Sequence, residues 1–81
     1  MSIAPELKKI LFTIGDLSHN DTNVSLIDSA ILRETKLPRF EINRVLTELS
    51  TLGLIKILPR PSGVDFKLVN ITREGLKELT S

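Results

Sequence analysis

The segment His19-Asn20-Asp21 holds the residue types that come closest to a chemical site. An imidazole beside a carboxylate could bind a metal ion or move a proton. The chain has a single His and no Cys, so a complete set of metal ligands is lacking. The sequence also shows no Ser/His/Asp arrangement, glycine-rich phosphate loop or carboxylate pair in a plausible pocket context. We therefore expect a polar loop at residues 18–23, and no enzyme activity, metal or cofactor.

The second group of candidate residues is basic and lies in the C-terminal half of the chain. Residues 53–71 contain Lys56, Arg60 and Lys67 against Asp65, so three cations and one anion give a local charge of +2. The whole chain carries eleven Lys and Arg against ten Asp and Glu, a net charge of +1. This total is too small to indicate nucleic-acid binding by itself. The distribution of charge makes this region the basic part of the molecule.

Composition indicates one folded domain that spans residues 1–81. Apolar residues make up 41% of the chain and charged residues 26%, which is ordinary for a globular protein. The absence of cysteine excludes disulfide bonds. No apolar run approaches the roughly 18 residues of a membrane span, and the N-terminus lacks the basic and apolar regions of a signal peptide. We expect a cytoplasmic protein that does not contact membranes.

Apolar spacing predicts three helices, over about residues 5–17, 26–35 and 38–52. Pro38 can open the third helix, and Gly53 stands where a left-handed residue often ends one. The inward stripe of the third helix is predicted to contain Ile42, Val45, Leu46, Leu49 and Leu52. The short gap between the second and third helices has the length of a helix-turn-helix corner.

A β-hairpin is predicted to follow. Residues 54–58 are rich in branched aliphatic side chains, and residues 64–68 alternate between apolar and polar. Two prolines and a glycine at residues 59–63 form the turn, with Arg60 at its tip. Val24 is a candidate for one strand pair with this hairpin, and Thr72 is expected to cap a last short helix. The sequence therefore predicts an α+β fold.

The residues Leu37-Pro38, Ile42 to Leu46 and Leu52 to Ile55 resemble the recognition segment of winged helix-turn-helix regulators of the MarR and PadR type. Ile71-Thr72 with Gly75 resembles the passage from the wing of that family into its last helix. The resemblance covers about residues 5 to 79. It implies three helices, a two-stranded hairpin wing and a short C-terminal helix. It also implies a transcriptional regulator that binds specific sequences of double-stranded DNA.

The same resemblance implies which residues face DNA. Helix 38–52 would enter the major groove, and the wing at residues 58–65 would contact the backbone or the minor groove. Arg44 can bind guanine and Asn43 can bind adenine through paired hydrogen bonds. The alternative for Arg44 is a solvated helix face with an ion pair to Glu48. The DNA-binding residues implied in this way are Arg39, Asn43, Arg44, Thr47, Arg60 and Lys67.

Two residues depart from the family pattern. Glu41 would repel phosphate unless it accepts a hydrogen bond from cytosine, and Phe40 is apolar but lies off the buried stripe. These departures favour a second function, a winged-helix module that binds proteins within a larger assembly.

A homodimer is expected, because regulators of this shape bind two half-sites as dimers. The helix at residues 5–17 and the last helix are too short to copy the long dimerisation helices of MarR proteins. Phe12 lies away from the apolar stripe of its helix, which favours a dimer contact; the alternative for this residue is burial under the C-terminal helix. The candidate interface residues are Ile3, Phe12 and Leu79. The sequence indicates no small-molecule effector.

Overall fold

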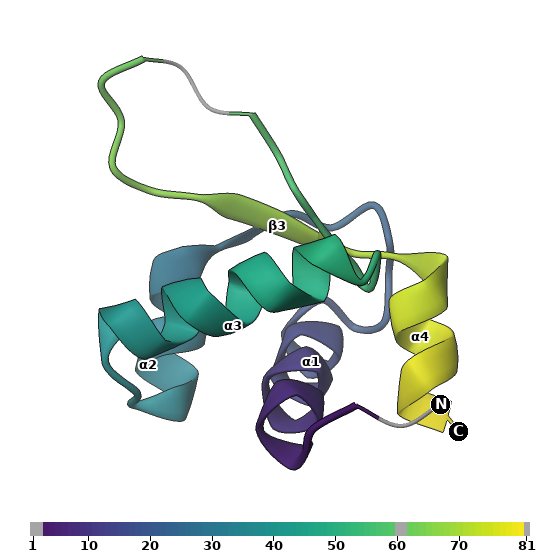
Figure 1. The fold of residues 1–81 in the computed structure, drawn as a ribbon. Helices are drawn as coiled ribbons and strands as arrows, with labels where there is room; N and C mark the ends of the chain where they lie inside the picture. Colours follow the sequence, from purple (N-terminus) through teal and green to yellow (C-terminus); the bar gives the residue numbers. More distant parts are fainter. Residues whose placement is uncertain (1–2, 60–61, 81) are drawn as a thin grey trace.

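The computed structural model describes residues 3–59 and 62–80. It confirms the α+β class, with four helices and a three-stranded antiparallel sheet among these residues (Figure 1). None of the described helices is both long and apolar enough to cross a lipid bilayer. The elements in chain order are α1 (Pro5–Leu17), β1 (Leu26–Ile27), α2 (Asp28–Thr35), α3 (Arg39–Thr51), β2 (Ile55–Ile57), β3 (Leu68–Ile71) and α4 (Arg73–Thr80).

The sheet has the order β1-β3-β2, so it contains one strand more than the predicted hairpin. Leu26 pairs with Val69, and Ile55 pairs with Ile71. The second helix was predicted to start at residue 26, but it starts at Asp28 because the two residues before it pair with β3. Ile27 lies in this strand and is exposed, and the strand pair predicted at Val24 forms two residues later.

The two strands of the hairpin differ from those predicted: β2 is one residue shorter at each end, and β3 lies at residues 68–71 in place of 64–68. Pairing ends where the Leu58 N–H donates to the Leu68 carbonyl oxygen (2.9 Å). Pro59 follows directly, as is common where a strand ends, and residues 64–67 form no strand, so β3 begins at Leu68. The described residues between β2 and β3, 58–59 and 62–67, project away from the helical body (Figure 1).

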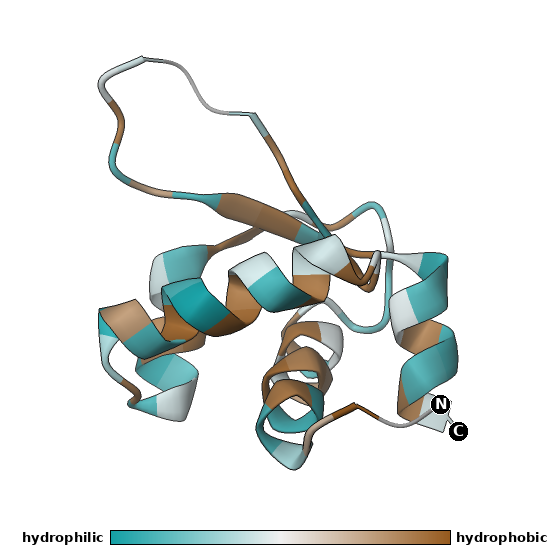
Figure 2. Ribbon diagram, in the orientation of Figure 1, coloured by the Kyte–Doolittle hydropathy of each residue, from teal (hydrophilic) through white to brown (hydrophobic). Residues whose placement is uncertain are grey.

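The core lies between the helices and the sheet. Figure 2 shows hydrophobic residues along β3 and on the side of α3 that faces α1. Leu52 was predicted to be inward but is 46% exposed, because it lies beyond the last residue of α3. The buried apolar residues are Leu7, Ile10, Leu11, Ile14, Ile31, Ile42, Val45, Leu46, Leu49, Leu54, Ile55, Val69 and Ile71.

Gly53 ends α3 as predicted, with a φ of 77°. The Leu54 N–H donates to the Leu49 carbonyl oxygen and the Gly53 N–H donates to that of Ser50, each at 3.0 Å. These two bonds are those of a Schellman motif, which places Leu54 against the end of the helix and directs the chain into β2.

Candidate functional site

The corner between α2 and α3 positions the candidate surface. Lys36 adopts a left-handed conformation with a φ of 60°, and its N–H donates to the Leu32 carbonyl oxygen (2.8 Å). Pro38 occupies the N-cap position of α3 in an extended conformation, as expected for a residue that cannot donate to a preceding turn. The helices α2 and α3 are therefore separated by three residues, which confirms the helix-turn-helix corner.

Arg39 ties this corner together. Its Nη1 lies 3.0 Å from Oδ2 of Asp28, the first residue of α2. Asp28 is only 2% exposed, whereas the Arg39 side chain is 55% exposed. Sequence reasoning missed this ion pair, which links residues eleven positions apart across the turn. Arg39 therefore compensates a buried charge and still presents part of its guanidinium to solvent.

Arg44 is surrounded by carboxylates. It contacts Glu48 at 3.0 Å, Glu6 of α1 at 3.3 Å, and Glu41. The ion pair of Arg44 with Glu48, which the sequence offered as an alternative to a base contact, is present. One cation among three anions leaves a local charge of −2, and hydrogen bonds from Arg44 to Glu41 and then Glu6 raise the pKa of the guanidinium. Arg44 stays charged, but its donors are engaged within the protein.

Asn43 and Thr47 also have polar atoms that are not free to face DNA. Oδ1 of Asn43 is buried and has no hydrogen-bond partner among the described residues. A paired contact to adenine uses both the oxygen and the nitrogen of the carboxamide, so Asn43 must turn its side chain to make one. Oγ1 of Thr47 donates to the Asn43 carbonyl oxygen (2.9 Å), which leaves its methyl group and the two lone pairs of its oxygen available.

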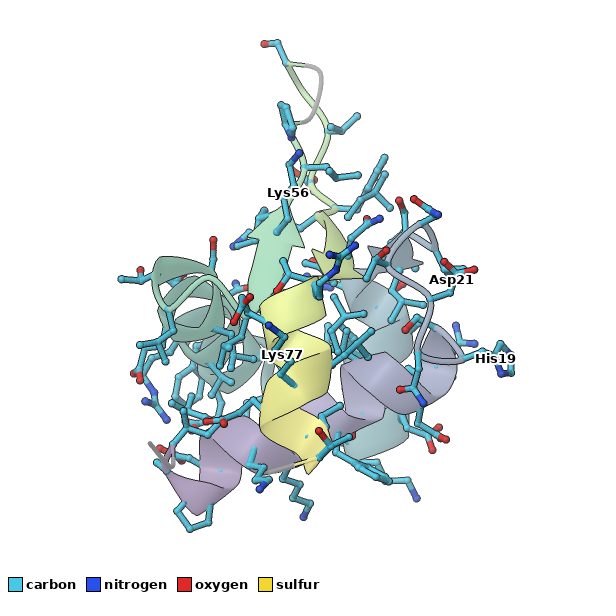
Figure 3. The ribbon with its side chains drawn as sticks, turned by 90° about the vertical axis from the view of Figure 1, so that its right-hand side faces the viewer. His19, Asp21, Lys56 and Lys77 are labelled. Carbon is cyan, nitrogen blue, oxygen red and sulfur yellow. The ribbon has the colours of Figure 1, made fainter. Side chains whose placement is uncertain are left out.

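The basic residues of the hairpin lie on a different element. Lys56 is exposed on β2, and Figure 3 shows it below the projecting β2–β3 connection. Lys67 is half-buried just before β3, where its carbonyl oxygen accepts the N–H of Asp28 (2.9 Å). Arg60 lies outside the described residues. The structure thus brings Arg39, Asn43, Arg44 and Thr47 together on α3 and sets Lys67 apart from them.

A groove lies between α1 and α4, on elements other than α3 and the hairpin. Phe12 borders it and is 63% exposed, so its predicted alternative, burial under the C-terminal helix, is wrong. Ile3 and Leu79 are half-buried and pack against the core of their own chain. The groove has a volume of about 380 Å³ and is lined by Phe12, Asp16, Asn20, Leu76, Leu79 and Thr80.

His19 belongs to a surface turn, as predicted. His19 and Asn20 have φ values of 56° and 57°, and the His19 N–H donates to the Asp16 carbonyl oxygen (3.1 Å). Figure 3 shows the side chains of His19 and Asp21 directed outward. Within the described ranges, no three His, Cys, Asp or Glu side chains gather closely enough to hold a metal ion.

No protein-family model and no curated protein sequence matches this chain. Among solved structures, the chain is similar to a mutant of MarR from E. coli in complex with operator DNA, with a TM-score of 0.78 and 19% sequence identity. The match covers 96% of this chain and 51% of that MarR chain, so this chain spans about half its length. Together with the α2–α3 corner and the antiparallel β2–β3 hairpin, this likeness establishes the fold as a winged helix-turn-helix.

Proposed function

We propose that this protein is a transcriptional regulator that binds specific sequences of double-stranded DNA. In this proposal α3 enters the major groove, and the wing at residues 58–65 contacts the backbone or the minor groove. The observation that carries the proposal is the α3 surface opposite the core, which is exposed from the helix-turn-helix corner onward. The solved MarR structure that shares this fold contains operator DNA, which supports duplex DNA as the partner.

The proposed contact residues have different tasks. Arg39 can bind a phosphate with the guanidinium edge that Asp28 leaves exposed. Lys67 and Arg60 supply further cations beside the wing, where sequence-independent contacts to phosphate are expected. Arg44 can bind guanine only if it exchanges its carboxylate partners for the base. Asn43 can bind adenine only after its side chain turns. Thr47 lies between Asn43 and Arg44 around the axis of α3 and would face the major groove of the DNA.

Binding to DNA should weaken steeply as salt is added. About 4–6 phosphate contacts per protomer give a slope of about −4 to −5 in a plot of log affinity against log salt concentration. We expect Lys67→Gln to reduce the size of this slope by about one, because one phosphate contact is lost. The measurement is fluorescence anisotropy of a labelled duplex across a salt series, first with a random-sequence pool and then with a selected site.

Lys77→Gln is the matched control for this experiment. Lys77 is exposed on α4 and pairs with Glu74 at 3.6 Å, away from the wing (Figure 3). Its replacement should leave the slope unchanged. If the wild-type protein binds no duplex in the random pool even at low salt, the DNA proposal is wrong. The exposed Phe40 and the carboxylates around Arg44 would then favour the second candidate function, a winged-helix module that binds proteins.

We further propose that the protein acts as a homodimer through the groove between α1 and α4. In a two-fold symmetric dimer both subunits use the same surface, so each must be complementary to itself. An exposed phenylalanine beside an apolar groove meets this requirement, because the ring of each copy can enter the groove of the other. Phe12 would supply the inserted ring, and Leu76 and Leu79 would form the floor. Ile3 would extend the contact from the segment before α1.

Phe12→Glu should convert the dimer to a monomer, because it buries an unpaired charge in the groove. Sedimentation equilibrium of the wild-type and variant proteins measures the change in mass. Phe40→Glu is the matched control, since Phe40 is equally a surface phenylalanine but lies on α3. A monomeric wild-type protein, or dimers of unchanged strength in Phe12→Glu, would rule out this interface.

A further inference from the structure

Phe40 is the most exposed of the large hydrophobic side chains in the described residues, at 73%. It is the second residue of α3, directly after the helix-turn-helix corner. At about 100° per residue, Phe40 lies about 190° from the centre of the buried stripe formed by Ile42, Val45, Leu46 and Leu49. Its ring therefore lies on the side of α3 that points directly away from the core, and it adds no buried apolar surface to the core. We call this side the outermost line of α3.

Thr47 and Thr51 continue the same outermost line. Both lie within about 20° of Phe40 around the helix axis. Oγ1 of Thr47 donates to the Asn43 carbonyl oxygen (2.9 Å), and Oγ1 of Thr51 donates to the Thr47 carbonyl oxygen (3.0 Å). Because each hydroxyl proton is used within the helix, these threonines offer outward only a methyl group and an acceptor oxygen.

The nearest charged donor to this line is also engaged. Arg44 lies about 40° from Phe40 and is bound by Glu6, Glu41 and Glu48. The outward face of α3 is consequently rich in apolar groups and poor in available donors. Among the groups in the major groove, the C5-methyl of thymine is the one that an apolar side chain such as Phe contacts favourably.

We propose that Phe40 is a specificity-determining residue that contacts the C5-methyl groups of thymine in the major groove. This inference rests on the proposed binding of duplex DNA by α3. Recognition helices place their N-terminal residues against base edges, and Phe40 occupies that end. Two other exposed large apolar residues flank α3. Leu37, in the corner before it, is 36% exposed, and Leu52 lies about 18 Å from Phe40 along the axis at the C-terminal end, so no continuous apolar patch runs along the helix as in a protein-docking site.

The test removes single methyl groups from the DNA. A duplex selected from a random pool by the wild-type protein is resynthesised with each thymine replaced in turn by deoxyuridine, which keeps the pairing edge and lacks only the C5-methyl. We expect affinity to fall about four-fold per contacted methyl at one or two positions. In Phe40→Ala the preference for thymine over deoxyuridine should disappear at those positions, and Phe40→Leu should keep part of it.

Leu52→Ala is the matched control, because it removes an exposed apolar side chain from the other end of α3. It should keep the full thymine preference. Thermal melting of all variants checks that they fold, which the exposure of Phe40 leads us to expect. The inference is overturned if deoxyuridine changes affinity at no position, or if Phe40→Ala retains the wild-type preference; in both cases duplex binding itself stands. Absence of wild-type binding to any duplex at low salt overturns the proposed function as well and assigns Phe40 to a protein partner.

Discussion

Gly75→Ala should lower the free energy of unfolding by about 3 kcal/mol or more, because the new methyl group overpacks a rigid contact. A Cβ at Gly75 would lie 2.2 Å from the carbonyl oxygen of Leu54 and 2.8 Å from Cγ1 of Ile71. The Leu54 carbonyl cannot turn away without loss, since it accepts the Thr72 N–H at 3.1 Å. The Gly75 N–H is itself held by Oγ1 of Thr72 at 3.0 Å, so both sides of the contact are fixed.

Gly15→Ala is the matched control. A Cβ at Gly15 would lie 2.9 Å from Oδ1 of Asn20 and 2.9 Å from Cδ1 of Leu79, which are the ends of flexible side chains. Both glycines are helical, so each replacement gains the same helix propensity of alanine, about 1 kcal/mol. Urea denaturation of the two variants then isolates the cost of the backbone contact. Equal stabilities would show that α4 can move away from Leu54 at little cost.

The helices of the core were predictable because their pattern is local. Leu7, Ile10, Leu11 and Ile14 repeat at helical spacing, and all are buried. Gly53 was predictable for the same reason, since the end of an apolar stripe and a glycine occur together. Strand β1 was predicted only as one strand pair at Val24, two residues too early, because two residues are too few to show alternation. The position of β1 depends on groups that are distant in sequence. One of them is Asn70, whose Oδ1 accepts a hydrogen bond from the Ser25 hydroxyl at 2.8 Å across 45 positions.

In the candidate site, too, local contacts could be predicted from the sequence and long-range contacts could not. The pair Arg44–Glu48 follows from i,i+4 spacing, and the sequence offered it as an alternative. Glu6 reaches Arg44 from another helix, so only the packing of α1 against α3 reveals it. The burial of Asn43 Oδ1 likewise depends on neighbours that no local pattern identifies. Sequence reasoning therefore found the exposed face of α3, but neither the contact of Arg44 with Glu6 nor the burial of Asn43 Oδ1.

Arg39→Ala should lower the free energy of unfolding by about 3 kcal/mol, because it leaves a buried carboxylate without its partner. Asp28 is almost fully enclosed at the start of α2, and the contact at 3.0 Å from Arg39 compensates its charge. Urea denaturation measures the loss. The double variant Asp28→Asn/Arg39→Ala should recover part of it, because the amide needs no counter-charge. If the single variant is as stable as the wild type, the ion pair contributes nothing to folding.

The single variant Asp28→Asn distinguishes the contribution of Arg39 to folding, through its ion pair with Asp28, from its proposed contact with DNA. This variant keeps the cation but frees the guanidinium edge that Asp28 now occupies. Affinity for duplex DNA should therefore stay at the wild-type level or rise, whereas Arg39→Ala should weaken binding even under conditions in which it is fully folded. The comparison uses anisotropy at a low salt concentration, with folding checked by circular dichroism. A loss of affinity in folded Asp28→Asn would mean that the ion pair itself sets the angle between α2 and α3 that DNA binding needs.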